Sequence, residues 1–101
     1  MKIAIVTGAS SGLGRAFIRR LDALGGLDEI WGVARRADRL EALAGELHTP
    51  LRPLSLDLLQ EESIAHIQAL LEAERPDLRL LINAAGFAKF GTWADMSLKE
   101  T

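Results

Sequence analysis

The 101-residue chain is long enough for one modest domain, and its apolar content of 49% excludes a disordered protein. The formal net charge of −2 argues against wholesale nucleic-acid binding, while the lack of cysteine excludes disulfides and thiolate chemistry and fits a cytoplasmic location. No apolar run approaches the length of a membrane span, and the N-terminal run, residues 3–6, is too short for a signal peptide.

A glycine-rich turn follows residues 3–6, which predict a buried strand, and precedes residues 13–24, which predict a helix. Such a turn cradles phosphate, because the free N–H groups and the dipole of the helix N-terminus favour an anion. Gly8 permits a sharp exit from the strand, Gly12 a close approach to a pyrophosphate, and Gly14 tight packing of helix on strand. The cofactor-binding residues expected in this turn are Gly8, Ser10, Ser11, Gly12, Leu13 and Gly14, and the serine hydroxyls can cap the helix or bind phosphate.

The helix over residues 13–24 is amphipathic and should end at the pair Gly25 and Gly26. The face that we expect to be buried carries Leu13, Ala16, Phe17, Leu21 and Leu24. Arg15, Arg19 and Arg20 are interpreted as its solvated face rather than as an anion site.

A second strand is predicted over residues 30–34, with Trp31 as a packing residue, and Arg35 and Arg36 follow it directly. Ala34 stands twenty residues after Gly14, where NAD-binding folds hold an acidic residue on the adenosine ribose. A neutral residue followed by two guanidinium groups favours the 2′-phosphate of NADP, so NADP is the expected cofactor and NAD the less favoured one. A solvated basic turn is the alternative interpretation.

Two further helices and two further strands complete the pattern. Residues 37–47 predict a helix whose buried face carries Leu40, Leu43, Ala44 and Leu47. Residues 51–56 predict a strand placed at the sheet edge by Pro50 and Pro53. Residues 61–74 predict the next helix, and residues 78–82 the fourth strand. The inward residues of that helix are expected to be Ile64, Ile67, Leu70 and Leu71.

Two motifs together resemble the short-chain dehydrogenase/reductase family. The first is Thr-Gly-x3-Gly-x-Gly at residues 7–14, and the second is Asn-Ala-Ala-Gly at residues 83–86, a variant of the family's usual Asn-Asn-Ala-Gly. The resemblance implies that Asp57 and Leu58 contact the adenine ring, although a helix cap or loop residue is nearly as good an interpretation of Asp57. It also implies that the second motif lies beside the ribose and nicotinamide; its residues are Asn83, Ala84, Ala85 and Gly86.

The fold class that follows is α/β, a three-layer Rossmann-like parallel sheet. We expect four strands in the order 3-2-1-4, three helices and the start of a fourth near Ser97. Residues 1–101 would be the N-terminal, truncated part of a single dinucleotide-binding domain, because a doubly wound sheet needs both of its halves.

The resemblance implies hydride transfer between a nicotinamide and a carbonyl or alcohol substrate, performed with a tyrosine, a lysine four residues later, a serine and an asparagine. The sequence contains no tyrosine, so no catalytic residue is assigned and residues 1–101 alone are predicted to be inactive. No metal site is indicated. A non-catalytic NAD(P)-binding or sensing module is the alternative function.

Self-association is expected through the side of the fourth strand. In a doubly wound sheet this face carries only the helix at residues 61–74, so apolar side chains of the first and fourth strands would be bare, and the fourth strand would be an unpaired edge.

Overall fold

The computed structural model describes residues 1–36 and 38–84. Within them the chain alternates strand and helix, as the sequence predicts, and the expected helix start near Ser97 lies outside the described residues. In chain order the elements are β1 (Lys2–Thr7), α1 (Gly12–Leu24), β2 (Glu29–Ala34), α2 (Asp38–Ala44), β3 (Leu51–Ser55), α3 (Glu61–Glu74) and β4 (Asp77–Asn83).

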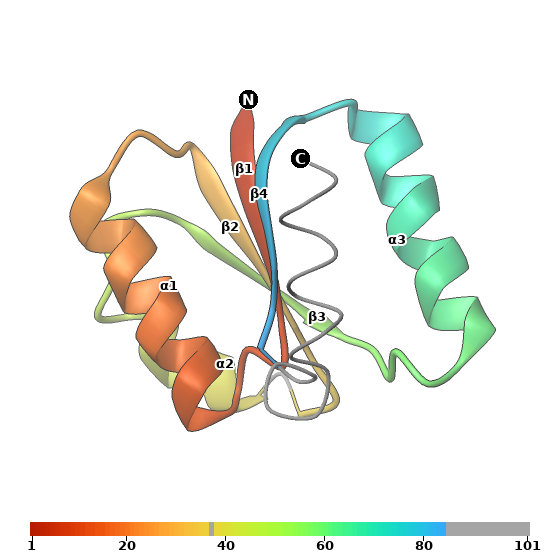
Figure 1. Ribbon diagram of the computed structural model, residues 1–101, viewed down its shortest axis with the longest axis horizontal. Helices are drawn as coiled ribbons and strands as arrows, with labels where there is room; N and C mark the ends of the chain where they lie inside the picture. Colours follow the sequence, from red (N-terminus) through yellow and green to blue (C-terminus); the bar gives the residue numbers. More distant parts are fainter. Residues whose placement is uncertain (37, 85–101) are drawn as a thin grey trace, which may run out of the picture.

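The four strands form one parallel sheet in the order β3-β2-β1-β4, which confirms the predicted order. α1 and α2 cover one face of this sheet and α3 covers the other (Figure 1). β3 lies at an edge of the described sheet. Pro53 has no N–H, but on an edge strand there is no further strand to which that N–H would donate a hydrogen bond. The chain therefore has the three-layer, Rossmann-like architecture expected from its sequence.

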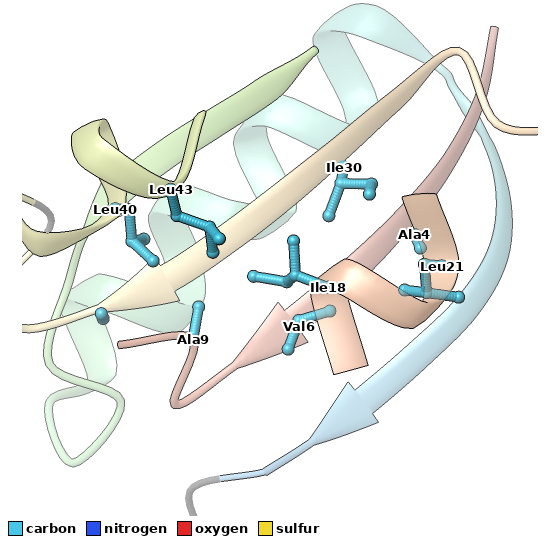
Figure 2. Close-up of a cluster of buried hydrophobic side chains, with 9 residues drawn as sticks. Ala4, Val6, Ala9, Ile18, Leu21, Ile30, Leu40 and Leu43 are labelled. Atoms are coloured by element: carbon cyan, nitrogen blue, oxygen red, sulfur yellow. The ribbon is translucent and has the colours of Figure 1, made fainter. Parts of the chain in front are cut away.

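The core on the α1 and α2 face joins the sheet to both helices (Figure 2). Ile18 and Leu21 of α1 and Leu40 and Leu43 of α2 are buried there. The sheet contributes Ala4 and Val6 of β1 and Ile30 and Ala34 of β2 to this core. Ala9, in the turn between β1 and α1, completes it.

The opposite core is centred on Trp31, which is fully buried as a packing residue, as predicted. Ile3, Ile5 and Val33 surround it, and the half-buried apolar residues of α3 pack against this cluster. The indole Nε1 donates a hydrogen bond to Glu29 at 2.5 Å, and the Arg52 guanidinium lies 4.7 Å from the ring centroid. The face of β1 is thus covered, contrary to the expectation that it would be bare.

The structure differs from most of the predicted buried face of α1 and from one residue of the predicted face of α3. α1 buries Gly14, Ile18 and Leu21, whereas Leu13 is 42% exposed and Leu24 is 70% exposed, so the face predicted for this helix is wrong except at Leu21 and the half-buried Phe17. In α3 the buried stripe begins at Ser63 rather than at Ile64, which is 49% exposed, and continues through the three remaining predicted residues Ile67, Leu70 and Leu71.

Across residues 1–36 and 38–84, no helix has both the length and the hydropathy that a bilayer crossing requires.

Candidate functional site

The carboxyl ends of the four strands meet at one edge of the sheet, because all strands run in the same direction. Hydrogen bonds continue the ladder just past the strands: Ala9 N donates to Val33 O, Leu56 N to Ala34 O, and Ala84 N to Thr7 O, each at 3.0 Å. These bonds fix the starting points of the loops that leave the sheet. Every predicted site residue within the described chain lies in or beside these loops.

The glycine-rich turn has the geometry that its residues predict. Gly8 leaves β1 with a φ of 64°, in the left-handed region that glycine adopts without strain. Ser11 is the N-cap of α1, since its Oγ accepts a hydrogen bond from Gly14 N at 3.0 Å and donates one to Gly8 O at 2.7 Å. Both ends of the turn are therefore held by one hydroxyl.

The other two glycines of the turn differ in what surrounds them. A Cβ on Gly14 would overlap Gly8 O and lie 2.8 Å from Ala9 Cα, so α1 can approach the turn only because this residue has no side chain. A Cβ on Gly12 would have nothing within 4 Å. Gly12 thus borders open space at the start of α1, where the backbone is accessible to a phosphate group.

The β2 end carries the basic residues. Ala34 is buried at the last position of β2, while Arg35 and Arg36 are exposed beyond it. The hydroxyl of Ser55, at the end of β3, donates a hydrogen bond to Arg35 O at 3.1 Å. The backbone of the arginine-bearing turn is thus tied to the neighbouring strand, while both guanidinium groups are left to solvent.

Asp57 and Leu58 follow β3, and both border the same open groove as the arginines. Asp57 Oδ1 accepts a hydrogen bond from Leu59 N at 3.0 Å, which is the Asx-turn geometry of a loop residue. Asp57 therefore acts as a loop residue through one carboxylate oxygen, while its position beside the groove also agrees with the implied contact to an adenine ring.

Asn83, the last residue of β4, is joined to β1 across the sheet edge. Thr7 Oγ1 donates a hydrogen bond to Asn83 Oδ1 at 2.7 Å. Ala84 is buried directly after it. Ala85 and Gly86, the other two predicted residues of this motif, lie outside the described residues.

A single groove of about 1160 Å³ unites these strand ends. Of the predicted site residues, eight line it, namely Gly8, Ser10, Ser11, Arg35, Arg36, Asp57, Leu58 and Asn83. The groove is not lined by three residues of α1, Gly12, Leu13 and Gly14, nor by the buried Ala84. The structure adds Arg39 to the lining, a residue that the sequence interpretation passed over because it falls inside a predicted helix.

The three arginines of α1 differ in their surroundings. Arg19 forms an exposed ion pair with Glu46 at 3.3 Å, and Arg20 is exposed, so both agree with a solvated face. Arg15 differs, because it is half-buried and its Nε has no hydrogen-bond partner. None of the three lines the groove.

Comparison with known proteins agrees with the fold and the motifs. The family model described as short chain dehydrogenase matches residues 2–101. A short chain dehydrogenase of Pseudocercospora fijiensis is 35% identical over 97 residues, covering 93% of this chain and 31% of that protein. An NADP-dependent 3-hydroxy acid dehydrogenase of Salmonella typhi is 35% identical over 86 residues, covering 85% of this chain and 34% of the relative.

Among solved structures, a 4-hydroxyisoleucine dehydrogenase in complex with NADH superposes with a TM-score of 0.65. It is 23% identical, and the match covers 80% of this chain and 32% of that chain, so it shows a shared fold. The chain spans about a third of the length of the curated relatives that it matches. On its sequence motifs, its sheet order and the match to the family model, the chain belongs to the short-chain dehydrogenase family.

Proposed function

We propose that the chain is the NADP(H)-binding part of an oxidoreductase that transfers hydride between a nicotinamide and a carbonyl or alcohol carbon. The observation that carries the proposal is the groove at the carboxyl ends of the four strands, which joins the glycine-rich turn to two exposed arginines. Dinucleotides bind at this edge of doubly wound sheets. Among the described residues, three arginines and one aspartate line the groove, which suits an anionic ligand.

The proposed dinucleotide site comprises residues that line the groove and residues next to it in the sequence. The first turn of α1 would receive the pyrophosphate, because Gly12 leaves space there and a helix N-terminus favours an anion. Asp57 and Leu58 would border the adenine, and Asn83, Ala84, Ala85 and Gly86 the nicotinamide ribose. NADP(H) would supply the hydride-transferring ring, whereas these residues bind and orient.

The preference for NADP(H) over NAD(H) rests on the end of β2. A buried alanine cannot accept hydrogen bonds from the ribose hydroxyls, and it does not repel a 2′-phosphate. Arg35 and Arg36 offer charge-assisted hydrogen bonds, worth about 1.5–3 kcal/mol, or roughly ten- to a hundredfold in affinity. The NADP dependence in the name of the Salmonella relative agrees with this preference, while the NADH-bound neighbour resembles this chain in fold alone.

Two substitutions test the cofactor choice by titration calorimetry of the full-length protein with NADP⁺ and NAD⁺. We expect Arg35→Ala to weaken NADP⁺ binding roughly ten- to a hundredfold and to leave NAD⁺ nearly unchanged, because only NADP⁺ has the 2′-phosphate. Ala34→Asp should shift the preference toward NAD⁺ by adding a ribose acceptor and a repulsive charge. Equal weakening of both cofactors by Arg35→Ala would show that the arginine is structural.

The alternative, a non-catalytic NAD(P)-binding module, is distinguished by turnover. The sequence holds no tyrosine, so we propose that residues 1–101 bind cofactor without catalysing transfer. Oxidation of NADPH by the full-length protein with a panel of ketones and aldehydes, followed by absorbance, would support the oxidoreductase. Cofactor binding without turnover of any of them would favour the module. Turnover by residues 1–101 alone would contradict the proposed lack of catalytic groups.

A further inference from the structure

We propose that Arg39 is a specificity-determining residue that supplies a third positive charge to the 2′-phosphate of the cofactor. This inference rests on the proposed function and deepens it. Arg39 lies in the first turn of α2, and it lines the groove together with Arg35 and Arg36. Residues of the glycine-rich turn, Ser10 and Ser11, border the same groove.

The backbone holds Arg39 in a fixed relation to the other two arginines. Its N–H donates a hydrogen bond to Arg36 O at 3.3 Å, which closes the turn between β2 and α2. The Ser55 hydroxyl fixes the other end of that turn through Arg35 O, and the buried Leu40 anchors α2 on the sheet. The three arginines therefore come from one segment of the chain, and all three line the same groove.

The charge of Arg39 is not neutralised by a neighbour within the described residues. Among residues 1–36 and 38–84, the ion pairs of arginines belong to Arg19, Arg52 and Arg79, and Arg39 takes part in none of them. Two acidic residues of α2, Asp38 and Glu41, flank it in sequence, yet neither borders the groove. An exposed guanidinium without an ionic partner is available to a phosphate.

An interaction of this kind discriminates by charge, so the test uses ligands that differ in the 2′-phosphate. Titration calorimetry of the full-length protein compares NADP⁺ and adenosine 2′,5′-bisphosphate with NAD⁺ and adenosine 5′-monophosphate. We expect Arg39→Ala to raise the Kd of the first pair about three- to tenfold and that of the second pair less than about twofold. The difference should shrink at high salt, because charges in an open groove are screened.

Two further variants make the result decisive. Arg39→Lys keeps the charge and should retain most of the affinity for the 2′-phosphate ligands. Arg20→Ala removes an exposed arginine of α1 that does not border the groove, and it should change none of the four Kd values. If Arg39→Ala behaves like Arg20→Ala, or weakens all four ligands equally, the inference is wrong while the proposed function stands. If the unmodified protein binds none of the four, the proposed function fails and the inference fails with it.

Discussion

At the scale of single residues, Gly14 and Gly12 show how two glycines of one turn serve different ends. Gly14 is buried against the turn that leaves β1, with no room for a methyl group, whereas Gly12 borders open space. The fold requires glycine at position 14, and we propose that ligand binding requires glycine at position 12. Substitution by alanine separates these two requirements.

Gly14→Ala should lower the free energy of unfolding by about 1–3 kcal/mol, because the added Cβ would overlap Gly8 O and force α1 away from the turn. Chemical denaturation followed by circular dichroism measures this change. An unfolding midpoint equal to that of the unmodified protein would contradict the close packing of α1 on the turn.

Gly12→Ala is the matched control for the fold and a test of the site. It should leave stability unchanged or slightly higher, since alanine favours the helix and its Cβ meets nothing within 4 Å. It should weaken NADP⁺ and NAD⁺ alike, because a methyl group would stand where the pyrophosphate approaches. Unchanged affinity for both cofactors would place the pyrophosphate elsewhere.

The sequence predicted the turn residues well, because glycine and serine have local roles that do not depend on distant packing. The positive φ of Gly8, the N-cap at Ser11 and the close approach at Gly14 all follow from short-range geometry. Arg39 could not be assigned from sequence, since its place beside the groove depends on how α2 docks on β2 and β3. The binding roles of these residues stay predictions.

At the scale of elements, the wrong assignments of Leu13 and Ile64 have a common cause. In α1 the buried stripe includes Gly14, and in α3 it includes Ser63. Apolar periodicity assigns no burial to small or polar residues, so burial was predicted for the neighbouring Leu13 and Ile64 instead. Helices approach a partner most closely where side chains are small, and these are the positions that a hydrophobic pattern overlooks.

α1 is also tied to the loop after α2 by one carboxylate. Asp22 accepts hydrogen bonds from Thr49 N at 2.7 Å and from His48 N at 3.1 Å. The bond from Thr49 is the main cause that holds the pKa of Asp22 below its ordinary value of 3.8, and the bond from His48 adds to it. The carboxylate therefore stabilises the folded chain more in its ionised form.

The sign of the pH dependence follows from the lowered pKa. The contribution of Asp22 is fully present above the ordinary pKa of 3.8 and is lost as the pH falls through the lower, folded-state pKa. Asp22→Ala should therefore lower the Tm at neutral pH and have progressively less effect below pH 3.8. Thermal unfolding across this range measures the effect, with Glu72→Ala, an exposed carboxylate of α3, as the control. A Tm difference that is independent of pH would show that the charge of Asp22 contributes nothing.

At the scale of the whole molecule, the described sheet ends at β4 with apolar side chains in solvent. Leu78, Leu80 and Leu81 are 41%, 45% and 57% exposed. The predicted strand order, with β4 at one end of the sheet, is confirmed. The predicted exposure of β1 is wrong, because α3 covers Ile3 and Ile5. The apolar surface expected on this side is therefore confined to β4 among the strands.

We expect residues 1–101, expressed alone, to self-associate through β4. This strand is an edge of the sheet formed by the described residues, and an edge strand with exposed leucines is a template for pairing. Light scattering at tens of micromolar should show a mass above that of the monomer. Leu81→Lys should reduce the association, whereas Leu24→Lys, at an even more exposed leucine of α1, should not. A monomer at this concentration would contradict the prediction, as would equal effects of the two substitutions.

The groove also has a thermodynamic consequence, because its walls come from the ends of four strands that are far apart along the chain. No local segment can form it, so the groove exists only when the parallel sheet is complete and in register. Any ligand that binds there is linked to folding, and at a hundred times its Kd it adds about 2.7 kcal/mol to the free energy of unfolding. The cellular level of the nucleotide would then set how much of the chain is folded as well as how much is loaded.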